Sequence, residues 1–450
     1  MPLTNFKKQT KSLILLAYPI LIAQLIQNLM GFFDTIMAGR VSSIDLAAVA
    51  IANSIWLPIV LSIYGLLMAL TTIISRLDGA KYYGDIPKQT YQTAWIALTL
   101  GIFLIISYHL LSPIISENIN LEIKLKTLMF DYLGYIVWGA PVYCLYLVLR
   151  NYAEGLSHTK PTMWISVIGL LINIPANYIF IYGKFGAPAL GGAGCGIATA
   201  LVYAGMFISM LIYCIYAKFF KHVYLFNQFY WPQGDKIKEL LTLGIPIAFA
   251  LLFEVSLFAI VAILLIPFGA EIIASHQIAL TFTSLIFMIP LSIGMAVTIK
   301  VGFALGNNQR QQAKEISFNA IILGLAIALF TATASLLFRY EIASLYSSEE
   351  DVINVAAGLM FLAALYQFSD TIQVISAGAL RGYKDTKAIL IITFFSYWVI
   401  GLGVGVILGL TDYIVPKIGP YGFWIGFISG LTAAAVFLAL RLKVVQRRIT

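Results

Sequence analysis

Three carboxylates stand inside apolar stretches that are long enough to cross a membrane. Asp34, Glu254 and Asp370 each have long apolar sequence on both sides. An ionised side chain at the centre of a membrane helix costs about 2.5–3.5 kcal/mol on insertion scales. Such residues therefore persist mainly where they face the interior of a bundle or a wet cavity. We expect these three acids to bind a cation or a cationic solute that crosses the membrane.

Two of the acids belong to the C-terminal half of the chain. Tyr366 and Asp370 are four residues apart, so they share one face of a helix. Together with Glu254 they offer two carboxylates and a phenol, hard oxygen ligands that suit Na⁺ or a transferable proton. We expect a Na⁺ site at Glu254 and Asp370, with Tyr366 beside it. The alternative is that both acids are protonated and only hydrogen-bond between helices, which is a costly use of two unpaired acids.

The third acid belongs to the N-terminal half, where amides accompany it. Asn173 and Asn177 are also four residues apart, and Pro175 between them frees a backbone carbonyl. We expect these amides, and the hydroxyl of Thr199, to meet Asp34 in a second site for a cation, a proton or the solute. Asn and Thr also commonly join membrane helices by hydrogen bonds, and that alternative stays open.

The composition indicates that lipid is the main solvent of this chain. Of its 450 residues 60% are hydrophobic and 11% are charged, whereas about a quarter are charged in soluble domains. The three cysteines lie in apolar segments and form neither a disulfide framework nor a metal motif. Apolar runs of at least about 18 residues predict an all-α protein with twelve membrane helices. The expected ranges are 11–38, 45–76, 92–112, 125–149, 162–182, 192–217, 240–266, 274–303, 313–337, 352–378, 387–410 and 420–443.

The basic residues predict the orientation in the membrane. With this helix assignment, 22 of the 28 Lys and Arg residues fall on the side of the two termini. Cytoplasmic segments carry the excess of Lys and Arg, so both termini are expected in the cytoplasm. The net charge of +8 is therefore a topology signal and not the footprint of a nucleic-acid-binding protein.

The two halves of the sequence repeat each other at an offset of 227 residues. Pro19 corresponds to Pro246, and Gly79 corresponds to Gly306. We expect a six-helix lobe over 1–217, a cytoplasmic linker over 218–239 and a second six-helix lobe over 240–450, with the lobes related by a pseudo-two-fold axis. This is the organisation of carriers that work by alternating access. The acids do not repeat, since Asp34, Glu254 and Asp370 correspond to Val261, Gln27 and Tyr143.

Other conspicuous residues carry less chemistry. Asp131 is expected near the outer end of its helix, in reach of water, and His276 is expected to be a hydrogen-bonded packing residue. The glycine-rich segment 191–196 is no phosphate loop, because no Lys-Ser/Thr follows it and no strand precedes it. No nucleotide-binding motif occurs elsewhere in the sequence, so we expect an ion gradient and not ATP to supply the energy. We also expect no enzyme activity and no cofactor.

Four stretches resemble one known family. They read MGFFDTIMAGRVSSIDLAAVAIANSIWLP, EGLSHTKPTMWISVIGLLINIPANYIFIYGKFGAPALGGAGCGIATA, ASHQIALTFTSLIFMIPLSIGMAVT and SDTIQVISAGALRGYKDT. The chain is similar over essentially its whole length to the multidrug and toxic compound extrusion (MATE) family, in its bacterial NorM-type branch. Arg76 departs from the pattern, since a Gln or Asn is expected at that position.

The resemblance implies a twelve-helix, V-shaped antiporter of the bacterial inner membrane. Such proteins export cationic lipophilic drugs and dyes in exchange for Na⁺ or H⁺. The resemblance assigns cation binding to Glu254 and Asp370, with Tyr366 beside them, and it matches the N-lobe acid to Asp34 with Asn173, Asn177 and Thr199. We favour Na⁺ over H⁺, and we expect a monomer.

Three rival functions are less consistent with the residues. A flippase for lipid-linked oligosaccharides or their precursors, from the same wider superfamily, would carry an anionic pyrophosphate and should line its path with Arg and Lys. A membrane-embedded enzyme would need a nucleophile–base pair or a metal motif such as HExxH, which the sequence lacks. A channel would not need the repeat that carriers use.

Overall fold

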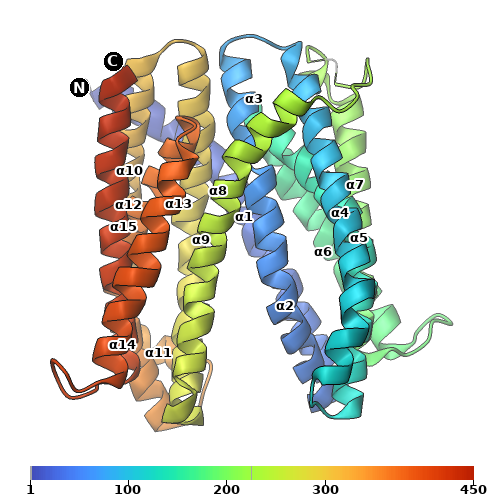
Figure 1. Cartoon of the computed structure of the whole chain (residues 1–450), viewed down its shortest axis with the longest axis vertical. Helices are drawn as coiled ribbons and strands as arrows, with labels where there is room; N and C mark the ends of the chain where they lie inside the picture. The colour runs from blue at the N-terminus through green and yellow to red at the C-terminus, as the bar shows by residue number, and fades with distance from the viewer. Residues whose placement is uncertain (1–2, 224, 450) are drawn as a thin grey trace. The chain divides into compact units, whose positions relative to one another are not determined.

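The computed structural model describes residues 3–223 and 225–449, and the described part of the chain is helical without strands (Figure 1). The chain forms two compact units. We call Pro19–Gly244 the N-unit, and we call Met1–Tyr18 together with Ile245–Thr450 the C-unit. The lobes expected over 1–217 and 240–450 were defined by the sequence repeat and stay a prediction. The two units are defined by how the helices pack.

The N-unit contains most of the first helix and the next six. Its elements are α1 (Leu3–Gly39, from Pro19 onward), α2 (Ser43–Leu67), α3 (Ala69–Gly79), α4 (Asp85–Asn118), α5 (Ile123–Gly155), α6 (Lys160–Tyr182), the 3₁₀ turn η1 (Gly191–Ala193), α7 (Gly194–Tyr216), the 3₁₀ turn η2 (Lys218–Phe220) and the start of α8 (Gly234–Leu264, up to Gly244).

The C-unit contains the start of α1 and the rest of the chain. Its elements are α8 (Gly234–Leu264, from Ile245 onward), the 3₁₀ turn η3 (Ile266–Phe268), α9 (Ala270–Gly306), α10 (Arg310–Leu337), α11 (Arg339–Ser344), α12 (Glu350–Gly382), α13 (Thr386–Phe394), the π-helical η4 (Phe395–Gly401), α14 (Leu402–Leu410) and α15 (Pro420–Ile449).

Twelve helical segments of the described chain are long and apolar enough to span a membrane, which confirms the expected number. Two of them change their helical geometry in the interior of the segment. The second is interrupted at Met68, where α2 ends and α3 begins. The eleventh changes from α13 into the π-helical η4 before it continues as α14. Hydropathy cannot reveal either irregularity, because the apolar composition continues through both.

Glycines set the closest helix contacts in each unit. A Cβ atom at Gly196 on α7 would lie 2.5 Å from the Tyr132 carbonyl oxygen on α5. In the C-unit, a Cβ atom at Gly426 on α15 would lie 2.5 Å from the Gly401 carbonyl oxygen. Only glycine allows backbones to approach this closely. Glycines of the sixth and twelfth membrane helices therefore allow close contacts with neighbouring helices.

Side-chain contacts show to which unit the start of α1 and the segment after α7 belong. Gln9, near the start of α1, accepts a hydrogen bond from the Asn319 amide of α10 and so packs within the C-unit. The segment after α7 packs back on the N-unit, where Trp231 stacks on Trp95 of α4 with ring centroids 6.3 Å apart. The side chain of Gln92 also bonds this segment, since it accepts from the backbone N–H of Gln233.

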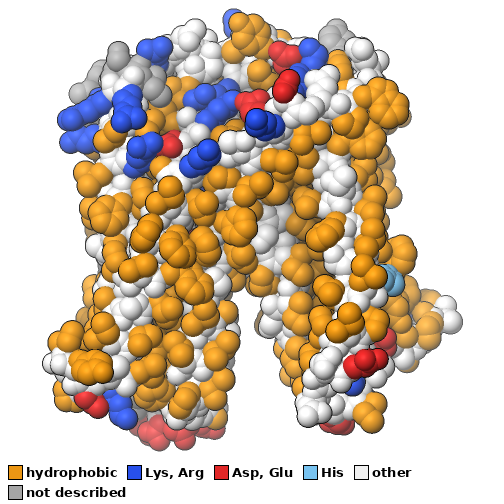
Figure 2. Space-filling model, viewed as in Figure 1, with side chains coloured by type: hydrophobic (Ala, Val, Ile, Leu, Met, Phe, Trp, Pro, Cys, Tyr) orange, Lys and Arg blue, Asp and Glu red, His pale blue; other side chains and the backbone are white. Residues whose placement is uncertain are grey.

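Lys and Arg side chains gather at one end of the C-unit. Figure 2 shows them at the end where α15 finishes. Figure 1 shows that α1 begins at this same end of the unit. Both ends of the chain therefore lie in a basic region of the C-unit, and the orientation expected from the sequence stays a prediction.

Candidate functional site

Asp34 is buried in the N-unit and accepts hydrogen bonds from two amides. Its side chain is 6% exposed. The Nδ2 atoms of Asn173 and Asn177 on α6 donate to its Oδ1 atom over 2.9 and 2.5 Å. The four-residue spacing on α6 presents both amides on one face of that helix, as the sequence predicted. The structure thus brings together three of the four residues expected here through direct hydrogen bonds.

Several oxygen atoms around Asp34 have no hydrogen-bond partner among the described residues. They include the Oδ1 atoms of Asn173 and Asn177 and the Oγ1 atom of Thr199. Thr199 lines the same pocket as Asp34 and so completes the expected set. A buried polar atom without a partner costs roughly 1–3 kcal/mol. These oxygens are therefore available to a cation, a proton donor or water.

Asp34 lines a large pocket inside the N-unit, which we call the Asp34 pocket. Its volume is about 530 Å³, and α1, α2, α5, α6 and α7 contribute its walls. Drug-sized ligands occupy pockets of about 300–1,000 Å³ with mostly apolar walls and a few polar groups. No Lys or Arg is found among the described residues that line it. The pocket is therefore of suitable size and charge for a lipophilic cation.

The aromatic side chains of this pocket could not be chosen from the sequence. Five aromatic residues line it: Phe32, Trp56, Tyr132, Tyr143 and Tyr203. The rings of Tyr143 and Tyr203 lie 4.2 Å apart, and the Trp56 indole N–H donates to the Tyr203 hydroxyl over 3.3 Å. Aromatic faces attract cations. Aromatic residues occur throughout this chain, so only the fold distinguishes these five from those that face lipid.

The C-unit brings together its own three expected residues. Glu254 lies on α8, whereas Tyr366 and Asp370 lie one turn apart on α12. The two carboxyl groups are close enough to interact electrostatically, and the Tyr366 hydroxyl interacts with both of them. Tyr366 is 5% exposed and Asp370 is 4% exposed. We call this set the acid pair. Its like charges favour a cation or a shared proton between them.

Tyr397 is a further residue of this site that the sequence did not reveal. It lies in the π-helical η4, is 1% exposed, and interacts electrostatically with both Glu254 and Asp370. Its hydroxyl has no hydrogen-bond partner among the described residues. Single π-helical turns often occur at functional sites. A tyrosine in an apolar run gives no signal of this role, since most such residues only pack or face the membrane interface.

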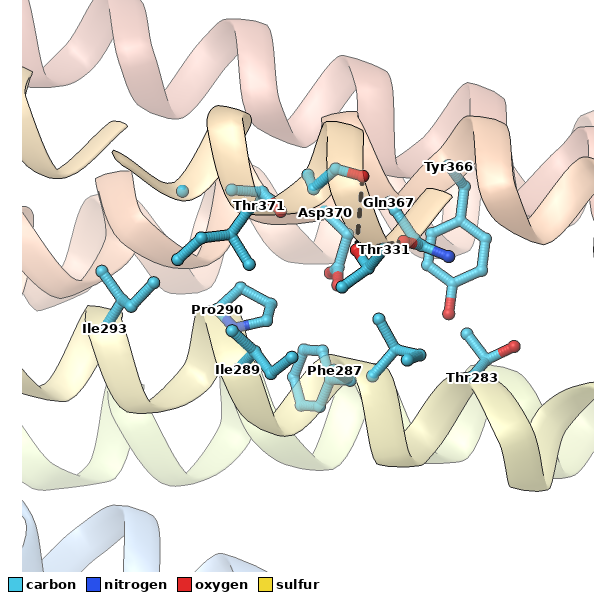
Figure 3. Close-up of a pocket in the computed structure, with 14 residues that line it drawn as sticks. Thr283, Phe287, Ile289, Pro290, Ile293, Thr331, Tyr366, Gln367, Asp370 and Thr371 are labelled. Carbon is cyan, nitrogen blue, oxygen red and sulfur yellow. Dashed lines mark hydrogen bonds between the residues drawn. The ribbon is translucent and has the colours of Figure 1, made fainter. Parts of the chain in front are cut away.

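A small cavity lies beside Asp370. In Figure 3, Tyr366, Gln367 and Asp370 of α12 point toward Thr283 and Pro290 of α9. The cavity volume is about 10 Å³, which is about the room that one water molecule needs. Proline has no N–H, so Pro290 leaves the carbonyl four residues earlier without its helical donor. Space for one small ion or water therefore adjoins the carboxyl group.

The remaining expectations concern residues outside these two sites. Asp131 is exposed, as expected. His276 accepts a hydrogen bond from the Trp424 indole over 3.1 Å, which agrees with a packing role. The glycine-rich segment forms a hydrogen bond with Asp45, whose carboxylate accepts from the Gly192 N–H over 2.6 Å. Among the described residues, no group of three or more His, Cys, Asp or Glu could hold a metal ion.

Comparison with known protein families assigns this chain to a family. The MatE family model matches residues 19–179 and again residues 246–407. The chain belongs to the MatE family. Its two matches begin 227 residues apart (246 − 19), which is the offset of the internal repeat expected from the sequence.

Curated relatives of this MatE protein are similar over almost their whole length. A "Probable multidrug resistance protein NorM" of Shewanella oneidensis is 50% identical over 439 residues, 98% of this chain and 95% of the relative. A "Multidrug resistance protein MdtK" of Yersinia pseudotuberculosis is 49% identical over 442 residues, 98% of this chain and 97% of the relative.

Solved structures share the fold of this MatE protein at lower identity. The eukaryotic MATE transporter AtDTX14 is 20% identical with a TM-score of 0.85, covering 99% of this chain and 100% of that chain. An outward-facing structure of a multidrug resistance MATE family transporter is 22% identical with a TM-score of 0.87. The match covers 98% of this chain and 97% of that chain. At these identities the likeness shows the fold alone.

Proposed function

We propose that this protein is a secondary active multidrug efflux antiporter of the bacterial inner membrane. It exports cationic lipophilic drugs in exchange for Na⁺ or H⁺, and both of its termini are cytoplasmic. The observation that carries this proposal is the Asp34 pocket, in which one buried carboxylate faces a drug-sized volume. The names of the curated relatives as multidrug resistance proteins support the same function.

The lining of the Asp34 pocket supports a cationic rather than an anionic substrate. Its only acid or base among the described lining residues is Asp34, and five aromatic side chains line the same volume. A cation above an aromatic face gains about 0.5–2 kcal/mol, and a desolvated carboxylate adds attraction. A flippase for a pyrophosphate-linked lipid would need Arg or Lys in this place, so this second candidate is disfavoured.

The acid pair supports coupling to a small cation. Glu254, Asp370, Tyr366 and Tyr397 supply hard oxygen atoms, and the adjoining cavity has room for one small ion or water. We favour Na⁺ because two carboxylates and two phenols offer several oxygen ligands at once. When one Na⁺ enters for each monovalent drug cation that leaves, no net charge crosses the membrane, so the Na⁺ concentration gradient drives export, and a tenfold gradient supplies about 1.4 kcal/mol.

The proposed cycle is alternating access with competing ligands. The ion binds from outside at the acid pair and favours the state that releases the drug. The drug binds from inside and favours the state that releases the ion. Each ligand can shift the equilibrium only by its difference in affinity between the two states. The protein therefore needs no nucleotide and no organic cofactor for this cycle.

The decisive experiment is efflux of ethidium from proteoliposomes with imposed gradients. An inward Na⁺ gradient at constant pH should accelerate efflux, and Asp34→Asn and Asp370→Asn should each abolish the acceleration. If only an inward H⁺ gradient accelerates efflux, the coupling ion is H⁺ and the Na⁺ assignment is wrong. If neither gradient moves ethidium or a fluoroquinolone, the antiport proposal itself fails.

A further inference from the structure

A second hollow of the N-unit lies between α2, α4 and α5. Its volume is about 200 Å³, and Ile59, Leu104, Leu111, Ile115 and Leu133 are among its lining residues. We call it the side groove. Tyr108 also lines it, but the hydroxyl of that residue already donates to the Phe130 carbonyl over 2.6 Å. The side groove therefore offers a ligand almost only hydrocarbon surface.

The rim of the side groove carries exposed aliphatic side chains. Ile55 on α2 is 44% exposed, and Leu111 and Ile115 on α4 are 51% and 43% exposed. All three lie within segments that are long and apolar enough to span a membrane. Exposed aliphatic side chains in such segments contact the acyl chains of the bilayer. A hydrocarbon chain dissolved in the membrane can therefore reach the groove without crossing water.

Trp56 separates the side groove from the Asp34 pocket. It lines both hollows, and its side chain is 7% exposed. Its indole N–H donates to the hydroxyl of Tyr203, over a rather long 3.3 Å. Tyr203 itself lines the Asp34 pocket. Trp56 is thus the one residue common to the described linings of an apolar groove and of a pocket that contains a carboxylate.

We infer that the side groove receives the alkyl chain of amphiphilic cations from the bilayer, and that Trp56 is the gate to the Asp34 pocket. This inference rests on the proposed function. The cationic head is bound at Asp34 while the tail occupies the groove. The groove has no charged lining residue among those described that could bind a lipid headgroup, so a transported amphiphile fits it better than a phospholipid.

Two neighbouring leucines of α4 provide a matched test. Leu111 lines the side groove, whereas Leu110 is 65% exposed and is not among the lining residues. Leu111→Trp fills the groove from its rim, and Leu110→Trp adds the same ring on the lipid side. In proteoliposomes, Leu111→Trp should slow efflux of dodecyltrimethylammonium about tenfold relative to Leu110→Trp, as expected when a tail loses its pocket. Efflux of ethidium, which lacks a long tail, should be equal in the two variants.

A second pair protects the test against a failure of folding. Ile115→Trp repeats the groove-filling change, and Ile114→Trp is its control, because Ile114 is 59% exposed and does not line the groove. Equal dodecyltrimethylammonium efflux in the groove-filling variants and their controls would overturn the inference. Loss of bound phospholipid from Leu111→Trp in native mass spectrometry, with unchanged efflux, would also overturn it. If the wild-type protein moves neither probe, the proposed function fails instead.

Discussion

At the acid pair, the hydroxyl of Tyr397 is an oxygen atom available to the proposed ion. It is buried near Glu254 and Asp370 and has no partner among the described residues. Tyr397→Phe removes this oxygen and keeps the ring. A hydrogen bond or ligand bond to a charged group contributes about 1.5–3 kcal/mol, so the Na⁺ affinity should fall about tenfold or more. Isothermal titration of the purified protein with Na⁺ measures this.

The control for Tyr397→Phe is Tyr413→Phe, because Tyr413 is 88% exposed in the connection between α14 and α15. That variant should bind Na⁺ like the wild type. Equal Na⁺ affinity in Tyr397→Phe and the wild type would exclude this hydroxyl from the ion site.

Individual residues also differ in whether their place in the two sites could be predicted from the sequence. Asp34, Glu254 and Asp370 were recognisable because a carboxylate in an apolar run is costly and therefore rare. Asn173 and Asn177 were recognisable from their helical spacing. Trp56 and Tyr397 were not, because aromatic residues are common in this chain at positions that only face lipid or pack. Their roles depend on which neighbours the fold supplies.

Within α5, a buried ion pair makes the helix dependent on both partners. The Arg150 Nε atom donates to the Glu154 carboxylate over 2.7 Å, and the two side chains are 3% and 0% exposed. Glu154→Leu leaves the guanidinium buried without this counter-charge, so the free energy of unfolding should fall by about 3–5 kcal/mol. The double variant Arg150→Met with Glu154→Leu should recover most of that loss. Thermal melting in detergent measures both.

An exposed pair in the same unit is the control. Lys88 and Asp85 are also joined over 2.9 Å, but their side chains are 37% and 47% exposed. Asp85→Asn should change the free energy of unfolding by at most about 1 kcal/mol, because water screens such pairs. A double variant of Arg150 and Glu154 that melts as low as Glu154→Leu would contradict the pairing argument.

Between α14 and α15, a glycine contact sets the distance of the two helices. A Cβ atom at Gly426 would lie 2.5 Å from the Gly401 carbonyl oxygen and 2.7 Å from the Gly405 Cα atom. Gly426→Ala should therefore push the helices apart and lower the free energy of unfolding by about 1–3 kcal/mol. Gly403→Ala is the control, because nothing lies within 4 Å of its Cβ position. That control should be neutral or slightly stabilising. Similar melting of both variants would contradict close packing here.

At the element scale, hydropathy predicted the number of membrane helices but not their irregularities. The interruption at Met68 and the π-helical turn of Phe395–Gly401 lie inside runs that are apolar throughout. Such features arise from backbone hydrogen bonding and from neighbouring helices, which a hydropathy window does not record. The π-helical turn matters most, because it carries Tyr397 to the acid pair.

The two sites lie in different compact units of the molecule. Asp34 belongs to the N-unit, whereas Glu254 and Asp370 belong to the C-unit. The sequence repeat predicted this separation, because Asp34 lies in its first half and the other two acids lie in its second half. None of the three acids has an acidic counterpart in the other half. A duplicated scaffold with unduplicated acids favours one task for each unit, with the ion at the acid pair and the drug at the Asp34 pocket.

This division makes a prediction for the whole molecule that binding measurements can test. In the wild type, Na⁺ should lower the affinity for ethidium, and ethidium should lower the affinity for Na⁺ by the same factor, because coupling between two sites is reciprocal. Asp370→Asn should weaken Na⁺ binding at least about tenfold and leave ethidium binding in Na⁺-free buffer unchanged. Asp34→Asn should do the reverse. Both variants should lose the mutual effect and hence coupled efflux.

The control for these two variants is Asp131→Asn, which neutralises an exposed acid and should retain both affinities and their coupling. Titration calorimetry for Na⁺ and fluorescence polarisation for ethidium give the two affinities separately. A fall in Na⁺ affinity in Asp34→Asn as large as that in Asp370→Asn would place ion binding in both units. The division of labour would then be wrong, because a site that loses its carboxylate in one unit should not alter direct ion contacts in the other.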